Sequence, residues 1–200
     1  EIPAGIGVRW ATPDTSHRVI SFVGDGTFLM APSELLTAAQ EHLPMTVVVS
    51  ENHGYQVIRR LQMWRSGAHY GNEFRYREGD NMATESGAKT LEGGYLDVDI
   101  VKIAEGLGAK ALRAVTPDEV RYALSSTRNE LEPVVIVVPT IQHANLPGSN
   151  VWWDVAPAEV FEQPWIEDRR VEFEDGQKHQ VWQSEEHTSE LQSHGTISYA

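Results

Sequence analysis

The chain has 200 residues, 40% of them hydrophobic, which predicts one globular domain or a large piece of one. It contains no cysteine, which excludes disulfides and thiolate metal sites, and its formal charge of -13 argues against a nucleic-acid-binding surface. No apolar run is long enough to span a membrane and no signal segment opens the sequence, so we expect a cytoplasmic protein.

Strands and helices are predicted to alternate along the chain. Short apolar runs rich in β-branched residues are typical of strands buried on both faces of a parallel sheet, and amphipathic stretches are typical of helices. The strands are predicted at 18–23, 45–50, 110–115 and 133–140. The helices are predicted at 3–11, 32–42, 55–64, 98–107 and 117–128, and the rest of the chain after 140 shows no regular pattern. Ser33 is a possible cap of the second helix, and Thr116 opens a start signal for the last.

This alternation predicts an α/β fold, a doubly wound and mostly parallel sheet with helices on both faces. Such sheets bind ligands at the carboxyl ends of their strands. Residues 65–97 form a long polar stretch with six glycines between two of the predicted helices. A loop of that length either closes over a ligand or is a disordered surface loop.

A lone carboxylate, Asp25, stands between Gly24 and Gly26 where the first predicted strand ends. The glycines allow a tight turn, and the amino end of a following helix suits an anion such as a diphosphate. Because a carboxylate repels an anion unless a cation lies between them, the arrangement predicts a phosphate bridged by Mg²⁺.

The second predicted strand ends at Asn52-His53-Gly54 and supplies further oxygen atoms. The side-chain oxygen of Asn52 and the carbonyl of Gly54 are suitable ligands for a hard cation. Asp25 and Asn52 are 27 residues apart, the length of one strand–helix–strand crossover, so adjacent parallel strands would bring both to one metal. Each motif alone is more often an ordinary turn, but the pair at neighbouring strand ends favours a metal site.

The order Gly-Asp-Gly, helix, strand, Asn-x-Gly resembles the signature of thiamine diphosphate-dependent enzymes, in the domain that holds the diphosphate. Within that superfamily, the stretches FRYRE, GGYLDVDIVKIAEGLGAKA and PGSNVWWDVAPAEV are similar to the hydrolases that open a trihydroxycyclohexane-dione ring in inositol breakdown. The resemblance implies that the substrate is a small cyclic diketone, cleaved with water to an open-chain deoxy-sugar acid. It implies thiamine diphosphate and Mg²⁺ as cofactors.

Carried over residue by residue, the resemblance implies that Asp25, Asn52 and the Gly54 carbonyl bind Mg²⁺. It implies that Gly26 and Thr27 meet the diphosphate with backbone amides and a hydroxyl. The full set of residues implied to bind the cofactor is Gly24, Asp25, Gly26, Thr27, Asn52, His53, Gly54 and Tyr55.

The resemblance also implies that part of the enzyme is absent from this sequence. In the family, the glutamate that activates the cofactor lies on a pyrimidine-binding domain that would precede Glu1, usually from a second subunit. We therefore assign no catalytic residue here, and we expect the chain alone to be inactive and the whole protein to be a homo-oligomer. Residues 1–162 are expected to form the truncated cofactor-binding domain and 163–183 a C-terminal extension.

The last residues, SEEHTSELQSHGTISYA at 184–200, have no helical or strand period. They resemble the translation of a sequencing-library adapter, and the alternative is a natural disordered tail. We expect 184–200 to be a non-native tail.

Several side chains keep two interpretations. His53 either touches the cofactor or caps a turn, and Arg59 and Arg60 either recognise an intermediate or lie on a solvated helix face. Tyr55 and Gln56 are better placed to line a pocket. His69, Tyr70, Arg75 and Tyr76 lie in the long polar stretch, which either closes over the substrate or is a disordered surface loop. Trp152 and Trp153 are either packing or interface residues or act directly in catalysis. No metal-ligand spacing links His143 with His179.

Two other functions stay open. One is an acetolactate synthase-like or benzoylformate decarboxylase-like carboligase or decarboxylase of the same superfamily. The other is a non-catalytic phosphate-binding α/β module, although the sequence lacks the GxxxxGK[ST] loop typical of one kind of nucleotide site.

Overall fold

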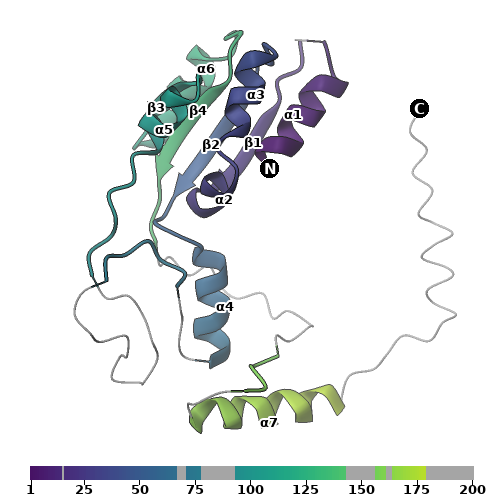
Figure 1. The fold of residues 1–200 in the computed structure, drawn as a ribbon, viewed down its shortest axis with the longest axis vertical. Helices are drawn as coiled ribbons and strands as arrows, with labels where there is room; N and C mark the ends of the chain where they lie inside the picture. Colours follow the sequence, from purple (N-terminus) through teal and green to yellow (C-terminus); the bar gives the residue numbers. More distant parts are fainter. Residues whose placement is uncertain (15, 67–70, 78–92, 143–155, 161–163, 179–200) are drawn as a thin grey trace, which may run out of the picture. The chain divides into compact units, whose positions relative to one another are not determined.

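The computed structural model describes residues 1–14, 16–66, 71–77, 93–142, 156–160 and 164–178 (Figure 1). The chain divides into two compact units, Glu1–Asn150 and Val151–Ala200. In the first unit the described strands are β1 (Ile20–Gly24), β2 (Thr46–Glu51), β3 (Lys110–Arg113) and β4 (Val134–Pro139). Its described helices are α1 (Ile2–Ala11), α2 (Asp25–Met30), α3 (Glu34–Gln40), α4 (Gln56–Ser66), α5 (Ile100–Gly106) and α6 (Pro117–Ser126).

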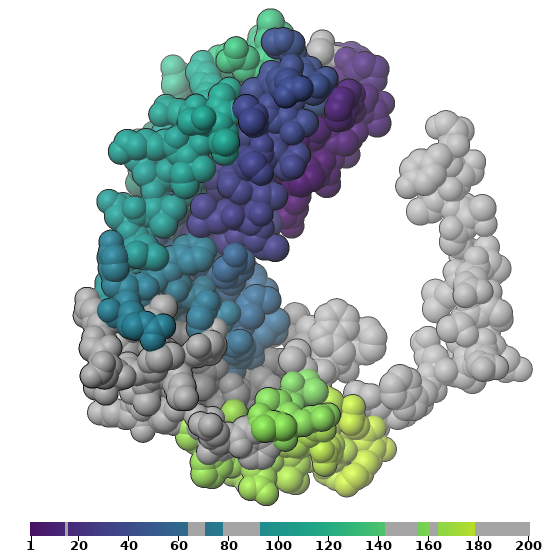
Figure 2. All heavy atoms as spheres, viewed as in Figure 1, coloured from purple at the N-terminus to yellow at the C-terminus, as the bar shows by residue number. Residues whose placement is uncertain are grey.

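The strands form one parallel sheet in the order β1-β2-β4-β3. Helices α1, α2, α3 and α5 pack on one face, where Val47, Val49, Val135 and Val137 are fully buried. Figure 2 shows the atoms of these helices as one continuous layer, purple to blue for the first three and teal for α5. Helix α6 packs on the other face against Ile136 and its neighbours. The α/β fold with a parallel sheet and helices on both faces is therefore confirmed.

The first strand differs from the prediction that both its faces are buried. Ser21 and Val23 are buried, but Ile20 and Phe22 are 51% and 70% exposed. The reason is position: β1 is an edge strand, and among the described residues α6 covers only the β3–β4 side of that face. In contrast β2, in the middle of the sheet, is buried along nearly its whole length.

Two helices were not predicted. Helix α2 begins at Asp25 itself, ahead of the helix expected from residue 32. Helix α7 (Pro164–Lys178), in the second unit, falls where no regular pattern was expected. Its surface is mostly charged, and its pairs three or four residues apart, such as Arg170 with Glu174, support a helix without an apolar stripe.

Within the long polar stretch at 65–97, two described segments pair with each other and with the turn after β2. Residues 93–96 pair with 74–76 in antiparallel fashion, and residues 72–74 pair with the turn after β2. The disordered-loop interpretation is therefore wrong for these two segments. None of the helices in the described part of the chain has the length and apolar character that crossing a membrane requires.

Candidate functional site

The predicted metal motifs meet at the carboxyl edge of the sheet. Strands β1 and β2 are neighbours, and Gly24 at the end of β1 is in register with Ser50, near the end of β2. Asp25 and Asn52 therefore follow two adjacent strands at the same edge, as the one-crossover spacing predicted. The Asp25 carboxylate lies inside the protein, with only 2% of the residue exposed.

Backbone amides surround the Asp25 carboxylate. The N–H of Gly26 donates to Oδ1 at 2.8 Å, the N–H of Asn52 donates to Oδ2 at 3.0 Å, and the N–H of Gly54 lies 3.2 and 3.3 Å from the two oxygens. Burial raises the pKa of the Asp25 carboxyl above its ordinary value, and these amide bonds offset part of that shift. A cation at this carboxylate would favour its charged form.

The side-chain amide of Asn52 lies between Asp25 and the Gly54 carbonyl. With its nitrogen turned toward them, it donates to the Gly54 oxygen at 2.9 Å and to Asp25 Oδ1 at 3.1 Å. The opposite orientation of the amide fills the same space and places its oxygen at those distances. Oxygens on adjacent corners of an octahedral Mg²⁺ site are about 3.0 Å apart, given Mg–O distances of about 2.1 Å. The residues present therefore fit a magnesium ion, with the amide oxygen turned inward.

The turn that carries these oxygens depends on backbone positions that favour glycine. His53 has φ of 59° and Gly54 has φ of 144°. A Cβ atom on Gly54 would lie 2.2 Å from the carbonyl oxygen of Asn72, because the segment 71–77 runs directly against the turn. The N–H of Tyr55 donates to that same Asn72 oxygen at 2.7 Å, and the N–H of Phe74 donates to the His53 carbonyl at 3.0 Å. We call residues 71–77 and 93–96 together the clasp.

A buried carboxylate, Glu73, holds the clasp to α4. Its side chain is 4% exposed and accepts bonds from Gln56 at 3.2 Å, Tyr95 at 2.9 Å and Arg75 at 3.0 Å. Arg59 on α4 lies 3.5 Å from the same carboxylate. Arg59 therefore faces Glu73 and not solvent, whereas Arg60, the other arginine of the pair, is exposed.

Aromatic contacts complete the site. The His53 ring stacks on Tyr95 with centroids 4.7 Å apart, and the Arg75 guanidinium lies 3.9 Å from the centroid of the same tyrosine. The Tyr55 ring packs so closely on Gly26 that a Cβ atom there would lie 2.7 Å from it. His53 thus has a packing role in this structure.

The structure brings together most of the predicted site residues. Asp25 contacts Gly26, Asn52 and Gly54, and Tyr55 packs on Gly26, as described above. The amide of Gly26 already bonds Asp25, and Gly24 and Thr27 are half-buried beside them. The other positions left open by the sequence lie outside the described residues: His69, Tyr70, His143, Trp152, Trp153 and His179.

Three residues of the clasp were not predicted to matter, namely Asn72, Glu73 and Tyr95. Their contacts with Tyr55, Gln56 and each other join residues 17 to 22 positions apart, without helical or strand periodicity. The only signal was that Glu73 and Tyr95 lie within or beside the stretches FRYRE and GGYLDVDIVKIAEGLGAKA.

Comparison with known families identifies the family of this chain. The model of the family described as "Thiamine pyrophosphate enzyme, C-terminal TPP binding domain" matches residues 1–138. A protein of Bacillus subtilis named 3D-(3,5/4)-trihydroxycyclohexane-1,2-dione hydrolase is 35% identical over 167 residues, 84% of this chain and 24% of that protein. A protein of the same name from Clostridium tetani is 32% identical over 83% of this chain and 24% of its own length. The chain thus spans about a quarter of the length of these relatives.

Solved structures show the same fold. A thiamine diphosphate-dependent 4-hydroxybenzoylformate decarboxylase of Rhodococcus jostii RHA1 matches with a TM-score of 0.54 and 25% identity, over 70% of this chain and 22% of that one. A benzoylformate decarboxylase from Polynucleobacter necessarius matches with a TM-score of 0.58 and 21% identity, over 72% of this chain and 24% of that one.

Proposed function

This chain belongs to the thiamine pyrophosphate enzymes, as a C-terminal TPP-binding domain, and we propose that it is the cofactor-binding part of a hydrolase that opens a trihydroxycyclohexane-1,2-dione ring. In that reaction a ring carbon–carbon bond breaks and one water molecule is consumed, which yields an open-chain deoxy-sugar acid. The curated relatives named for this activity support the substrate class, with 31–35% identity over about four fifths of the chain.

One observation carries the cofactor part of the proposal: the amide of Asn52 lies 2.9 Å from the Gly54 oxygen and 3.1 Å from Asp25. Asp25, Asn52 and the Gly54 carbonyl would hold Mg²⁺, and the ion would offset the repulsion between the buried carboxylate and a diphosphate. Gly26 and Thr27 would line the diphosphate side. When bound, thiamine diphosphate supplies the nucleophilic carbon for attack on a carbonyl.

The remaining residues of the site would orient the cofactor and enclose it. Gly24 begins the turn, and the Tyr55 ring against Gly26 closes one wall. His53, stacked on Tyr95, would present its polar edge near the cofactor. The clasp fixes the turn, and so fixes the position of the Gly54 carbonyl.

The chain alone is proposed to be inactive, since the activating glutamate is expected on an upstream pyrimidine-binding domain, supplied by a second subunit of a homo-oligomer. Location in the cytoplasm, the domain bounds at 162 and 183, and the foreign origin of 184–200 stay predictions. Turnover by the purified 200-residue chain with both cofactors would contradict the proposed inactivity.

The test uses the full-length protein with its upstream sequence restored and residues 184–200 removed. It is assayed with thiamine diphosphate and Mg²⁺ on the trihydroxycyclohexane-dione and, in parallel, on pyruvate and benzoylformate. We expect cofactor-dependent ring opening that Asp25→Ala abolishes. The matched control Asp118→Ala changes an exposed carboxylate on α6 and should leave the rate unchanged.

The second candidate function is a decarboxylase or carboligase. The match to a protein named 4-hydroxybenzoylformate decarboxylase, at 25% identity, favours it. Carbon dioxide release from a 2-keto acid, with the cyclic dione left intact, would move the function to this candidate while keeping the metal site. The family match favours either enzyme over a non-catalytic phosphate-binding module.

A further inference from the structure

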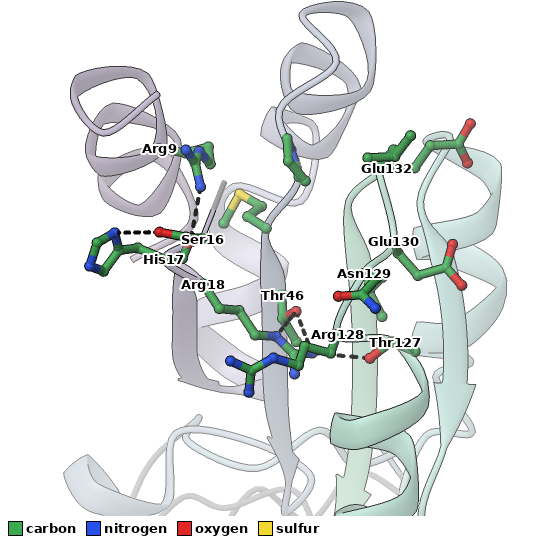
Figure 3. A pocket seen from close by; sticks show the side chains of 14 residues that line it. Arg9, Ser16, His17, Arg18, Thr46, Thr127, Arg128, Asn129, Glu130 and Glu132 are labelled. Carbon is green, nitrogen blue, oxygen red and sulfur yellow. Dashed lines mark hydrogen bonds between the residues drawn. The ribbon is translucent and has the colours of Figure 1, made fainter. Parts of the chain in front are cut away.

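A hollow lies at the opposite edge of the sheet from Asp25. Its volume is about 350 Å³, and its walls come from the amino ends of β1, β2 and β4 and from the turn after α6 (Figure 3). A strand of five or six residues separates the two edges, so the hollow is roughly 20 Å from the candidate metal site. The proposed function does not use it.

The floor of the hollow is the guanidinium of Arg18. Its Nε and Nη2 donate to the Thr46 hydroxyl at 3.1 and 2.8 Å, and Nη2 also donates to the Thr127 hydroxyl at 3.0 Å. Its Nη1 donates to the Leu124 carbonyl. All of these partners are neutral, so they fix the position of Arg18 without neutralising its charge (Figure 3).

A second arginine, Arg128, reaches the same hollow. Burial and then the nearby charge of Arg128 lower the pKa of Arg18 below its ordinary value, which places two cations close together. Among the described residues neither guanidinium forms an ion pair. Of the two carboxylates at the rim, Glu130 pairs with Lys110, and Glu132 is exposed.

A third cation, Arg9, lines one side of the hollow. It is 3% exposed, and its guanidinium donates to the carbonyls of His17 and Asp14 at 3.0 Å each and to that of Thr12. These bonds hold the connection between α1 and β1 in place. The positive charge of Arg9 is buried, and its hydrogen-bond partners are neutral carbonyl groups. In a chain with a net charge of -13, this is a local concentration of positive charge.

We propose that this hollow binds a phosphate group, either free or carried by a small molecule, between Arg18 and Arg128. The exposed guanidinium of Arg128 can match phosphate oxygens with paired, charge-assisted hydrogen bonds. Arg18, whose Nε and Nη2 already donate to the threonine hydroxyls, contributes mainly its charge, and an anion between two close cations removes their mutual repulsion. The hydroxyls of Thr46 and Thr127 accept hydrogen bonds from the Arg18 guanidinium and fix its position. The volume is at the small end of the range for ligand sites, which suits a sugar phosphate in size.

The test is calorimetric titration of the 200-residue chain with glucose 6-phosphate, inorganic phosphate and, as the neutral control, glucose. EDTA is present throughout, so that a phosphate group cannot bind through Mg²⁺ at Asp25. We expect binding of a phosphate-bearing probe but not of glucose, and at least about tenfold weaker binding in Arg128→Gln. Because the Arg128 side chain is exposed and forms no hydrogen bond or ion pair with the described residues, this variant should keep the native fold, which circular dichroism checks.

The matched control is Arg121→Gln, an exposed arginine on α6 that pairs with Asp118 outside the hollow, and it should bind like the wild type. Tighter binding of glucose 6-phosphate identifies a phosphorylated small molecule as the ligand, and equal binding of inorganic phosphate identifies free phosphate. Amide shifts in NMR spectra should locate the probe at Thr127 and Asn129. The proposal is overturned by no binding of either anion up to about 10 mM, or by equal binding in the wild type and Arg128→Gln.

Discussion

Replacing Gly54 by alanine tests whether the clasp holds the turn of the candidate metal site. The new Cβ would lie 2.2 Å from the Asn72 carbonyl oxygen, on a backbone with φ of 144° that other residues rarely adopt. Backbone strain of about 1–3 kcal/mol is expected, together with about 1 kcal/mol for each of the two bonds at Tyr55 and Phe74 that the displaced turn loses. We therefore expect the free energy of unfolding to fall by about 3–5 kcal/mol.

The assay is urea unfolding combined with hydrogen exchange at the amides of Tyr55 and Phe74. The matched control is Gly94→Ala in the clasp, where a Cβ atom meets nothing within 4 Å, so its free energy of unfolding should change by less than about 1 kcal/mol. Faster exchange at both amides should accompany the loss of stability in Gly54→Ala. If the two variants are equally stable and exchange is unchanged, the clasp does not hold the turn.

Three further predictions concern stability and titration. Thr116→Ala should lower the free energy of unfolding in urea by about 1 kcal/mol, because the Thr116 hydroxyl accepts a hydrogen bond from a backbone amide in the first turn of α6. Ser33→Ala, at an N-cap without such a bond, should lower it by less than about 0.5 kcal/mol. Equal losses would contradict the capping role. Glu73→Ala should cost about 3–5 kcal/mol, because it leaves the half-buried guanidiniums of Arg59 and Arg75 uncompensated, while Arg121→Ala breaks an exposed pair and should cost under about 1 kcal/mol. Burial, followed by the neighbouring carboxylate, raises the pKa of Tyr95, so stability should fall as pH rises from its unfolded-state pKa to its folded-state pKa. An ultraviolet titration should show a late tyrosine ionisation that Tyr95→Phe removes, and no late phase would refute the shift.

Local patterns in the sequence were enough to predict the four strands, five of the helices and the two metal motifs. Strand-forming runs and amphipathic stretches report on a residue's near neighbours, and a glycine-flanked Asp25 after a strand needs only local geometry. The spacing of Asp25 and Asn52 predicted their meeting because one crossover usually joins adjacent parallel strands. The structure confirms that the two residues meet, because the N–H of Asn52 donates a hydrogen bond to Asp25 Oδ2 at 3.0 Å.

The tertiary structure alone decided the rest. Whether Ile20 and Phe22 are buried depends on β1 being an edge strand, which no local pattern states. Glu73 and Tyr95 join the site only because separate parts of a long polar stretch fold back onto the turn after β2. The arginines at the amino edge likewise come together from three places in the chain. Contacts between distant residues depend on how the elements pack, and local periodicity does not carry that information.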